Sequence, residues 1–388
     1  MLKRMRLENF RAFEKVDIEF APLTVLIGAN STGKSSILHA LVLLKQSLRG
    51  GDYRVPLSFG GPLIDVGRLK ELAWQGHKSL YFQLEWENGL GIGFRVTSAK
   101  KVGLSVARKE FRFLFAGKWH QLPDEAVGVE PWYFSFEPAG SDQALEDEKR
   151  RALREVNATL TDFFKRLRYV GPLRMPFRET SISEEKPESV GPDARYLVPF
   201  LLHHPDVMRF ITEWFREHDL AEGLEVRETA RGSGRWAVYL LEKAGRRVNL
   251  VDTGFGYSQL IPVLAEIYGA PEGSLILIEQ PELHLNPRLA IWLGDVLISA
   301  VRGGKSVLVE THSEHIVLRL RRRIAEGGLD RSQLALYFTL RTPEEGKSSL
   351  QKIELGDAGQ LVEKWPEGFW DEDYKETYEL MRAALSRR

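Results

Sequence analysis

The sequence contains no cysteine among its 388 residues. Disulfides, thiolate metal sites and cysteine nucleophiles are therefore excluded. It also lacks net charge, because 54 basic residues balance 54 acidic ones. This balance argues against nucleic-acid binding through the overall field of the molecule, and leaves local basic patches open.

The chain has no long hydrophobic run either. No stretch approaches the roughly 20 apolar residues that a helix needs to span a bilayer. The basic start at residues 1–6 leads into polar residues, whereas a signal peptide would continue with an apolar segment. We therefore expect a cytoplasmic protein with no membrane partner.

A phosphate-binding loop is the clearest feature that is present. The apolar run at residues 23–27 is followed at once by Gly-Ala-Asn-Ser-Thr-Gly-Lys-Ser and then by an amphipathic helical pattern. In a GxxxxGKS loop, successive backbone N–H groups turn toward a phosphate, and the helix start adds partial positive charge. We expect Lys34 to contact the β and γ phosphates and Ser35 to ligate Mg²⁺. The expected nucleotide contacts of the loop are Gly28, Ala29, Asn30, Ser31, Thr32, Gly33, Lys34, Ser35 and Ser36.

Two more short apolar runs in the second half end in polar residues that suit the same site. Residues 275–278 form one run, and the acidic Glu279 follows it. In a parallel sheet this carboxylate lies at the carboxyl edge, so Glu279 is the expected second Mg²⁺ ligand, directly or through water. The other run, at residues 306–310, is followed by Thr-His-Ser. His312 is placed there to hydrogen-bond a γ phosphate, and Ser313 to cap the next helix.

In this order the elements resemble the ATP-binding-cassette ATPases of the RecF, SMC and OLD group. Residues 28–35 match the Walker A loop, residues 275–279 the Walker B strand, and His312 the switch histidine. Residues 252–259, Asp-Thr-Gly-Phe-Gly-Tyr-Ser-Gln, resemble the signature motif, although they depart from the LSGGQ of transporters. The resemblance implies that Gly254, Gly256 and Ser258 grip the ATP held by a second subunit, in a head-to-tail homodimer.

The chain is also similar to a set of bacterial AAA-family ATPases whose function is poorly defined. The shared segments are Leu-Glu-Asn-Phe-Arg at 7–11, Tyr-Val-Gly-Pro-Leu-Arg at 169–174, Glu-Gln-Pro-Glu-Leu-His-Leu at 279–285, Glu-Thr-His-Ser-Glu-His at 310–315 and the tail Trp-Pro-Glu-Gly-Phe at 365–369. In the resembling families basic residues near the first segment reach the nucleotide, which makes Arg11 a candidate contact. The likeness implies an ATP and Mg²⁺ site, and no particular substrate.

One position departs from the cassette pattern. Cassette ATPases usually carry a glutamate after the Walker B acid, whereas this chain has Gln280. An amide positions water but does not accept its proton, and general-base assistance is worth about 10²–10⁴ in rate. We therefore expect slow hydrolysis unless Glu282 serves as the base; the alternative is that Glu282 only holds the following loop. Gln280, Glu282 and His312 are the candidate catalytic residues.

The pattern along the chain predicts an α/β fold, an ABC-type P-loop ATPase head with an antiparallel β subdomain and a helical insert. Residues 1–138 are expected to form an N-terminal lobe with Walker A and the β subdomain, and 139–222 the insert. Residues 223–330 hold the signature, Walker B and the switch histidine, and 331–388 form a C-terminal appendage. SMC proteins carry a coiled-coil arm where the insert lies, but the heptads here are not sustained, which favours short helices.

The function that these features favour is an ATP-driven conformational switch in bacterial DNA maintenance or antiphage defence. Residues 329–388 are few for a further domain, so we expect a separate effector such as a nuclease. Two alternatives stay open: a transporter motor subunit, which the missing LSGGQ opposes, and an ATP-binding scaffold that does not hydrolyse. Arginines at 319 and 321–323 either contact nucleic-acid phosphates or form a solvated helix face.

Overall fold

The computed structural model describes residues 1–49, 57–98, 106–121, 143–174, 178–181, 186–342, 344, 346–363, 376, 378–380 and 382–383. The tail motif noted at 365–369 therefore lies outside the described residues. Within the described part, no helix is long and apolar enough to cross a membrane.

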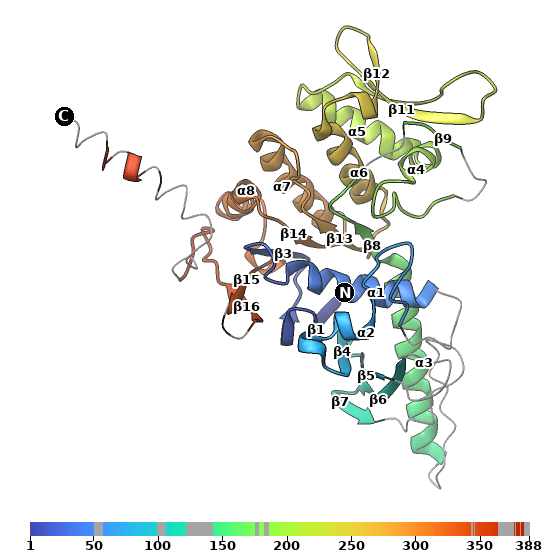
Figure 1. The fold of residues 1–388 in the computed structure, drawn as a ribbon, viewed down its shortest axis with the longest axis vertical. Coiled ribbons are helices and arrows are strands. Elements are labelled where there is room, and N and C mark those ends of the chain that lie inside the picture. The colour runs from blue at the N-terminus through green and yellow to red at the C-terminus, as the bar shows by residue number, and fades with distance from the viewer. Residues whose placement is uncertain are drawn as a thin grey trace.

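A mostly parallel sheet forms the centre of the molecule, with the strand order β16-β15-β3-β14-β13-β8 (Figure 1). All neighbours in it are parallel except β15 and β16, which form an antiparallel pair. The sequence runs of β3, β13 and β14 are apolar because both faces of such a sheet are covered. The strands are β3 (Leu23–Gly28), β8 (Arg168–Val170), β13 (Leu275–Glu279), β14 (Ser306–Glu310), β15 (Leu334–Thr342) and β16 (Lys347–Ile353).

The two faces of this sheet belong to two different cores, because side chains alternate along each strand. Val25, Ile276 and Val309 pack into a core with α6 (Phe255–Gly269), α7 (Pro287–Arg302) and α8 (Glu314–Ala325). Leu26, Leu277 and Leu308 pack on the other side with α1 (Lys34–Arg49). As expected, the Ser313 side chain caps α8 by accepting a hydrogen bond from the Ile316 N–H.

An antiparallel sheet with the order β2-β1-β4-β5-β6-β7 extends the second core (Figure 1). It confirms the β subdomain expected from alternating apolar residues, which are buried on the face toward α1. Its strands are β1 (Leu2–Phe10), β2 (Phe13–Glu19), β4 (Ser79–Trp86), β5 (Gly91–Ser98), β6 (Val106–Phe115) and β7 (Lys118–Gln121). The short helices α2 (Leu69–Leu72) and η1 (Trp74–Gly76) lead into β4.

Helix α3 (Gln143–Arg166) is the first helix of the predicted helical insert. Its apolar residues Leu153, Val156, Leu160 and Phe164 are buried in the core that also contains α1. The described part of the insert is therefore a packed helix, in keeping with the heptads that are not sustained.

A third sheet packs with α4 (Leu197–His203) and α5 (Pro205–Glu217) at the far end of the molecule (Figure 1). It consists of β10 (Gly223–Glu228), β11 (Arg235–Leu241), β12 (Arg247–Asn249) and β9 (Thr180–Ser181), and the turn η3 (Leu250–Asp252) connects it to α6.

The central sheet takes strands from every part of the predicted division. β3 comes from residues 1–138, β13 and β14 from 223–330, and β15 and β16 from 331–388. The range 139–222 also contributes a strand, β8, beside its helices. The division into four parts stays a prediction, with this strand as an addition to the helical insert.

Candidate functional site

The loop between β3 and α1 has the backbone that a phosphate cradle requires. Gly28 and Gly33 adopt φ values of 143° and 101°, which side-chain-bearing residues rarely adopt. A Cβ on Gly28 would also lie 2.4 Å from the Thr339 Oγ1 on β15. Glycine at position 28 is thus required by both conformation and space.

Lys34 is held inside this loop. Its Nζ donates hydrogen bonds to the carbonyl oxygens of Gly28 at 2.9 Å and Ala29 at 2.7 Å. The side chain is only 3% exposed, and this burial lowers the pKa of the Lys34 ammonium. Thr32 Oγ1 donates to the Ala29 carbonyl at 2.8 Å and closes the loop. The one cation of the loop is therefore placed where its backbone turns.

Two carboxylates lie side by side next to the loop. Glu279 and Glu310 are register partners at the ends of β13 and β14, and both are buried. Burial and the charge of Glu279 raise the pKa of Glu310 to about 7, while a hydrogen bond with Ser35 opposes this rise. Glu310 was not among the sequence candidates, although it directly precedes the Thr-His-Ser segment.

These groups fit Mg²⁺, which prefers oxygen ligands. The hydroxyl of Ser35 and the carboxylates of Glu279 and Glu310 come together from three elements. Among the described residues, Glu310 Oε2 is buried without a hydrogen-bond partner. A buried carboxylate oxygen with no donor is a suitable ligand for a cation.

Glu279 is further held by a chain of side chains that begins at Arg11. Glu279 Oε1 accepts hydrogen bonds from the Tyr169 hydroxyl and from His39 Nε2, each at 2.7 Å. Arg11 Nη1 lies 2.6 Å from His39 Nδ1. Because a guanidinium only donates, Nδ1 accepts and Nε2 carries the proton. The structure thus links Arg11 to the Walker B carboxylate through His39, a residue that the sequence patterns did not single out.

Residues 280–282 turn the chain from β13 toward the switch segment. Gln280 adopts φ 43°, and its N–H donates to the Glu310 carbonyl at 2.8 Å. Glu282 Oε1 accepts a hydrogen bond from the His312 backbone N–H at 2.7 Å. Glu282 Oε2 is buried without a partner in the described chain, and burial raises the pKa of this carboxyl group.

His312 lies beside the same groups. Burial and the nearby Lys34 charge lower the pKa of the His312 imidazole to about 4. The ring is therefore neutral at physiological pH. A neutral imidazole presents one donor and one acceptor, which suits it to hydrogen-bond a phosphate oxygen.

The signature residues lie at the start of α6, and they differ in solvent exposure. Gly254 is the N-cap of α6 and is exposed, with no atom within 4 Å of an added Cβ. Phe255 is 68% exposed. Ser258, in contrast, is buried and its hydroxyl donates to the Leu250 carbonyl at 3.2 Å. The Ser258 side chain is thus bonded within its own chain, and its contact with a partner's ATP stays a prediction.

The arginine row on α8 bonds to acceptors within the chain. Arg319 and Arg323 both pair with Asp295 on α7. Arg322 pairs with Glu326, and Arg321 Nε donates to the Gly359 carbonyl at 2.8 Å. These contacts fit the solvated-face interpretation and leave no cluster of unpaired cations on this row.

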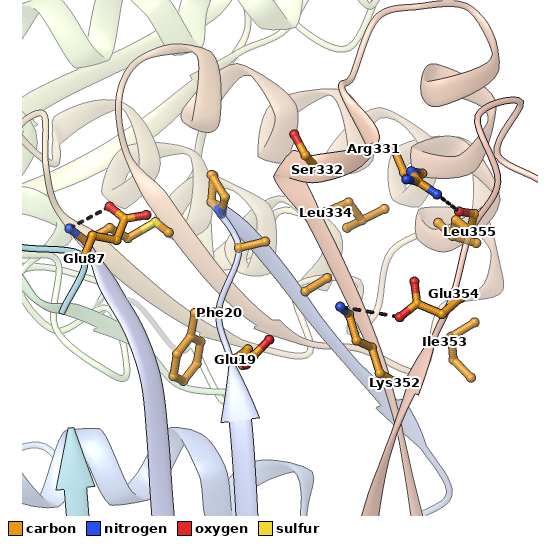
Figure 2. A pocket seen from close by; sticks show the side chains of 14 residues that line it. Glu19, Phe20, Glu87, Arg331, Ser332, Leu334, Lys352, Ile353, Glu354 and Leu355 are labelled. Atoms are coloured by element: carbon orange, nitrogen blue, oxygen red, sulfur yellow. Dashed lines mark hydrogen bonds and ion pairs between the residues drawn. The ribbon is translucent and has the colours of Figure 1, made fainter. Parts of the chain in front are cut away.

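A cavity of about 320 Å³ lies at the other end of β3 and β15 (Figure 2). Phe20, Leu334 and Leu355 line it, together with the ion pair of Lys352 and Glu354. No residue of the phosphate loop, the Walker B strand or the switch segment is among its lining residues. The nucleotide motifs thus lie at the carboxyl edge of the sheet, away from this cavity.

The family follows from the chain's match to a known group of sequences. A family profile described as "AAA domain, putative AbiEii toxin, Type IV TA system" matches residues 23–318. The chain belongs to this family. The matched span begins with β3 and ends in α8, so it contains the phosphate loop, the signature, the Walker B strand and the switch histidine.

Other known proteins are similar in part or in fold. A 63-residue stretch is 41% identical to the OLD nuclease of Thermus scotoductus (strain ATCC 700910 / SA-01) and covers 15% of this chain and 12% of that protein. The match thus spans about an eighth of the nuclease. An SMC head bound to the C-winged helix domain of ScpA has a TM-score of 0.50 and 14% identity, over 92% of this chain and 98% of that one. The SMC head domain from Thermotoga maritima has a TM-score of 0.44 and 13% identity, over 91% and 99%.

The chain thus has the predicted α/β P-loop fold, and it resembles the ATPases of the RecF, SMC and OLD group. The family match and the SMC head fold confirm this resemblance. The tail at 365–369 lies outside the residues that the structure describes. The individual site residues stay predictions, for which the geometry above supplies the positions.

The buried carboxylate pair predicts a pH-dependent stability. The pKa of Glu310 rises from 4.5 to about 7 on folding. Between these pH values the folded chain keeps a proton that the unfolded chain has lost, so the free energy of unfolding falls as pH increases. In buffer with EDTA, Glu310→Gln should remove this fall and stabilise the protein at pH 8 by up to about 3 kcal/mol. At pH 4.5 the two proteins should differ little.

Urea unfolding of both proteins at the two pH values measures this effect. The exposed Glu155 on α3, replaced as Glu155→Gln, is the matched control and should leave the pH dependence unchanged. If the free energy of unfolding of Glu310→Gln fell with pH as much as that of the parent, the assignment of this effect to Glu310 would be contradicted.

Proposed function

We propose that this chain is a Mg²⁺-dependent ATPase head that hydrolyses ATP slowly and works as a dimerising switch. One observation carries the proposal. A lysine, a serine hydroxyl, two buried carboxylates, the half-buried Glu282 and a neutral histidine come together at one edge of the sheet, next to a loop with phosphate-cradle backbone. Phosphoryl transfer needs groups that bind phosphate, hold Mg²⁺ and orient the attacking water, and this edge of the sheet offers residues suited to each task.

The roles follow from chemistry and position. The loop amides and Lys34 would bind the phosphates, and Ser35, Glu279 and Glu310 would hold Mg²⁺, which neutralises phosphate charge when it is bound.

The residues after the Walker B strand would serve hydrolysis. The Gln280 amide would orient water. Glu282 has a raised pKa and one oxygen without a donor in the described chain, which favours it over Gln280 as proton acceptor. His312 would hydrogen-bond the γ phosphate.

A second copy of the chain would complete the site. Gly254 and Phe255 leave the start of α6 exposed, and a helix N-terminus attracts phosphate. Leu173, which is 66% exposed, adds another apolar side chain close to the residues that contact α6. We infer a head-to-tail homodimer in which the signature of one copy meets the ATP of the other.

We place this switch in bacterial DNA maintenance or antiphage defence, in the cytoplasm. The partial match to an OLD nuclease and the fold of SMC heads support this placement. The chemistry on DNA or RNA would belong to a separate effector protein, such as a nuclease, that responds to the ATP state. The bonded arginines of α8 give no support to direct nucleic-acid binding at that row.

ATP binding should depend on Lys34. Lys34→Ala removes the only cation inside the loop, so ATP affinity measured by calorimetry should fall by about 100-fold or more. Lys70 is an exposed lysine on α2, and Lys70→Ala should bind as the parent does. Parent-like affinity in a folded Lys34→Ala variant would contradict the ATP site.

Hydrolysis should depend on Glu282. Glu282→Gln keeps the shape and the hydrogen bond from His312 but removes the proton acceptor, so turnover should fall by about 10²–10⁴ while ATP still binds. Phosphate release measures turnover, and calorimetry measures binding. The competing assignment predicts that Gln280→Glu raises turnover and that Glu282→Gln has little effect.

Dimerisation should depend on the exposed start of α6. ATP with Mg²⁺ should double the mass seen by light scattering, and Phe255→Asp should prevent this, because it places a charge in an apolar contact and opposite a phosphate. Leu318→Asp on α8 changes another exposed apolar residue and should still associate. A mass that ATP leaves unchanged in the parent and both variants would refute the composite site.

A further inference from the structure

Arg174 is a buried arginine that the proposed chemistry does not use. It ends the Tyr-Val-Gly-Pro-Leu-Arg segment that follows α3, and its side chain is 0% exposed. Burying a guanidinium is costly unless it is bonded and balanced by opposite charge. The contacts of Arg174 therefore indicate which part of the site this segment positions.

The guanidinium holds the end of the Walker B strand by its backbone. Arg174 Nη2 donates to the Glu279 carbonyl at 3.1 Å and to the Gln280 carbonyl at 2.6 Å. The charges of Glu279 and Glu282 favour its charged form and oppose the effect of burial. Gln280 is the residue with positive φ. Arg174 thus contacts the strained residue that starts the 280–282 turn.

The backbone of Arg174 is in turn held by the signature helix. Gln259 Nε2 donates to the Arg174 carbonyl at 2.6 Å, and the Gln259 side chain is 3% exposed. Gln259 lies on α6 five residues after its N-cap Gly254. A continuous path of hydrogen bonds therefore runs from α6 through Arg174 to the 280–282 turn, within one chain.

Tyr169, at the other end of the segment, holds the same strand by its side chain. Its hydroxyl donates to Glu279 Oε1, while Arg174 bonds the backbone of residues 279 and 280. The segment therefore fixes both the carboxylate and the carbonyl at the end of β13. Both hydrogen bonds leave Nη2, while Nε and Nη1 are buried without a partner among the described residues. A lysine side chain is one bond shorter than the path to Nη2, so its ammonium would fall short of these carbonyls.

We propose that Arg174 is a positioning residue that couples the signature helix to the hydrolysis turn of the same chain. The inference rests on the proposed ATPase dimer and deepens it. The signature of each copy would contact the partner's ATP, whereas the path through Gln259 and Arg174 leads to the copy's own Glu282. ATP binding at one site would thereby change the position of Glu282 at the other site, and hydrolysis would be cooperative.

The test replaces Gln259, because removing Arg174 from a fully buried position could unfold the chain. Gln259→Met keeps the length of the side chain and removes the hydrogen bond to Arg174. The matched control is Gln46→Met on α1, a buried glutamine whose hydrogen bonds go to Ser58 and Ile64 instead. Arg174→Lys is the second variant and keeps the charge on a side chain that is one bond too short to reach both carbonyls.

Two kinds of measurement are made on the full chain. Gln259→Met should lower kcat by about tenfold, as the loss of one buried hydrogen bond implies, with ATP affinity unchanged and the Hill coefficient of hydrolysis reduced toward 1. Hydrogen exchange should become faster at the amides of Leu283 and Leu285, which bond to the Gln280 and Glu282 carbonyls. Gln46→Met should leave kcat, the Hill coefficient and these exchange rates unchanged. Arg174→Lys should have the same effects as Gln259→Met.

The outcomes separate this inference from the proposed function. Parent values of kcat and of exchange in Gln259→Met would overturn the coupling. A parent that does not hydrolyse ATP would refute the ATPase proposal, and hydrogen exchange alone would then decide the link: faster exchange at 283 and 285 supports it, and unchanged exchange overturns it. Faster exchange throughout the chain would indicate general destabilisation and count against a specific role.

Discussion

Two buried carboxylates at the same height on neighbouring strands are the constraint on which this structure depends. Glu279 and Glu310 are register partners, so their charges repel each other in a medium where water is scarce. The protein offsets part of this cost with the Tyr169 hydroxyl, His39 and Ser35. What remains unbalanced is negative charge beside a phosphate loop, and a divalent cation is the natural partner for such charge.

The central sheet explains how elements from distant parts of the chain reach this point. Alternate side chains of β3, β13 and β14 belong to different cores, one with α6 to α8 and one with α1. The phosphate loop leads into a helix on one face, and the signature begins a helix on the other. The phosphate loop and the Walker B carboxylate thus meet at the carboxyl edge, which is where open α/β sheets generally bind their ligands.

The sequence predicted the features that depend on local pattern. The phosphate loop, the β13 and β14 strands and the Ser313 cap each follow from residues that are neighbours along the chain. His39, Tyr169 and Glu310 were missed as site residues because their roles arise from contacts between distant elements. His39 and Glu279 are 240 residues apart in the sequence, so no local sequence pattern predicts their contact. β8 is three residues long, too short for a strand signal.

Ser258 shows a different limit. The match to a signature motif gave the residue type and the approximate position of the helix start, but not the residue at which α6 begins. α6 begins at Phe255, so position 258 lies one turn inside the helix on the side of the buried Ile261. Which side chains of α6 face solvent depends on how the helix packs against its neighbours, and a motif match carries no information on that packing.

Helix α3 is tied into this arrangement at its C-terminal end. Lys45, on the phosphate-loop helix α1, is buried and its Nζ donates to the Phe164 carbonyl at 2.7 Å and to the Leu167 carbonyl at 2.5 Å. The chain then passes into β8, which pairs with β13, and on to Tyr169 and Arg174. α3 therefore does not tilt without breaking either the Lys45 bonds or the edge of the central sheet. Helix α3 is thus bonded to the Walker A helix and leads directly to the residues that hold the Walker B strand.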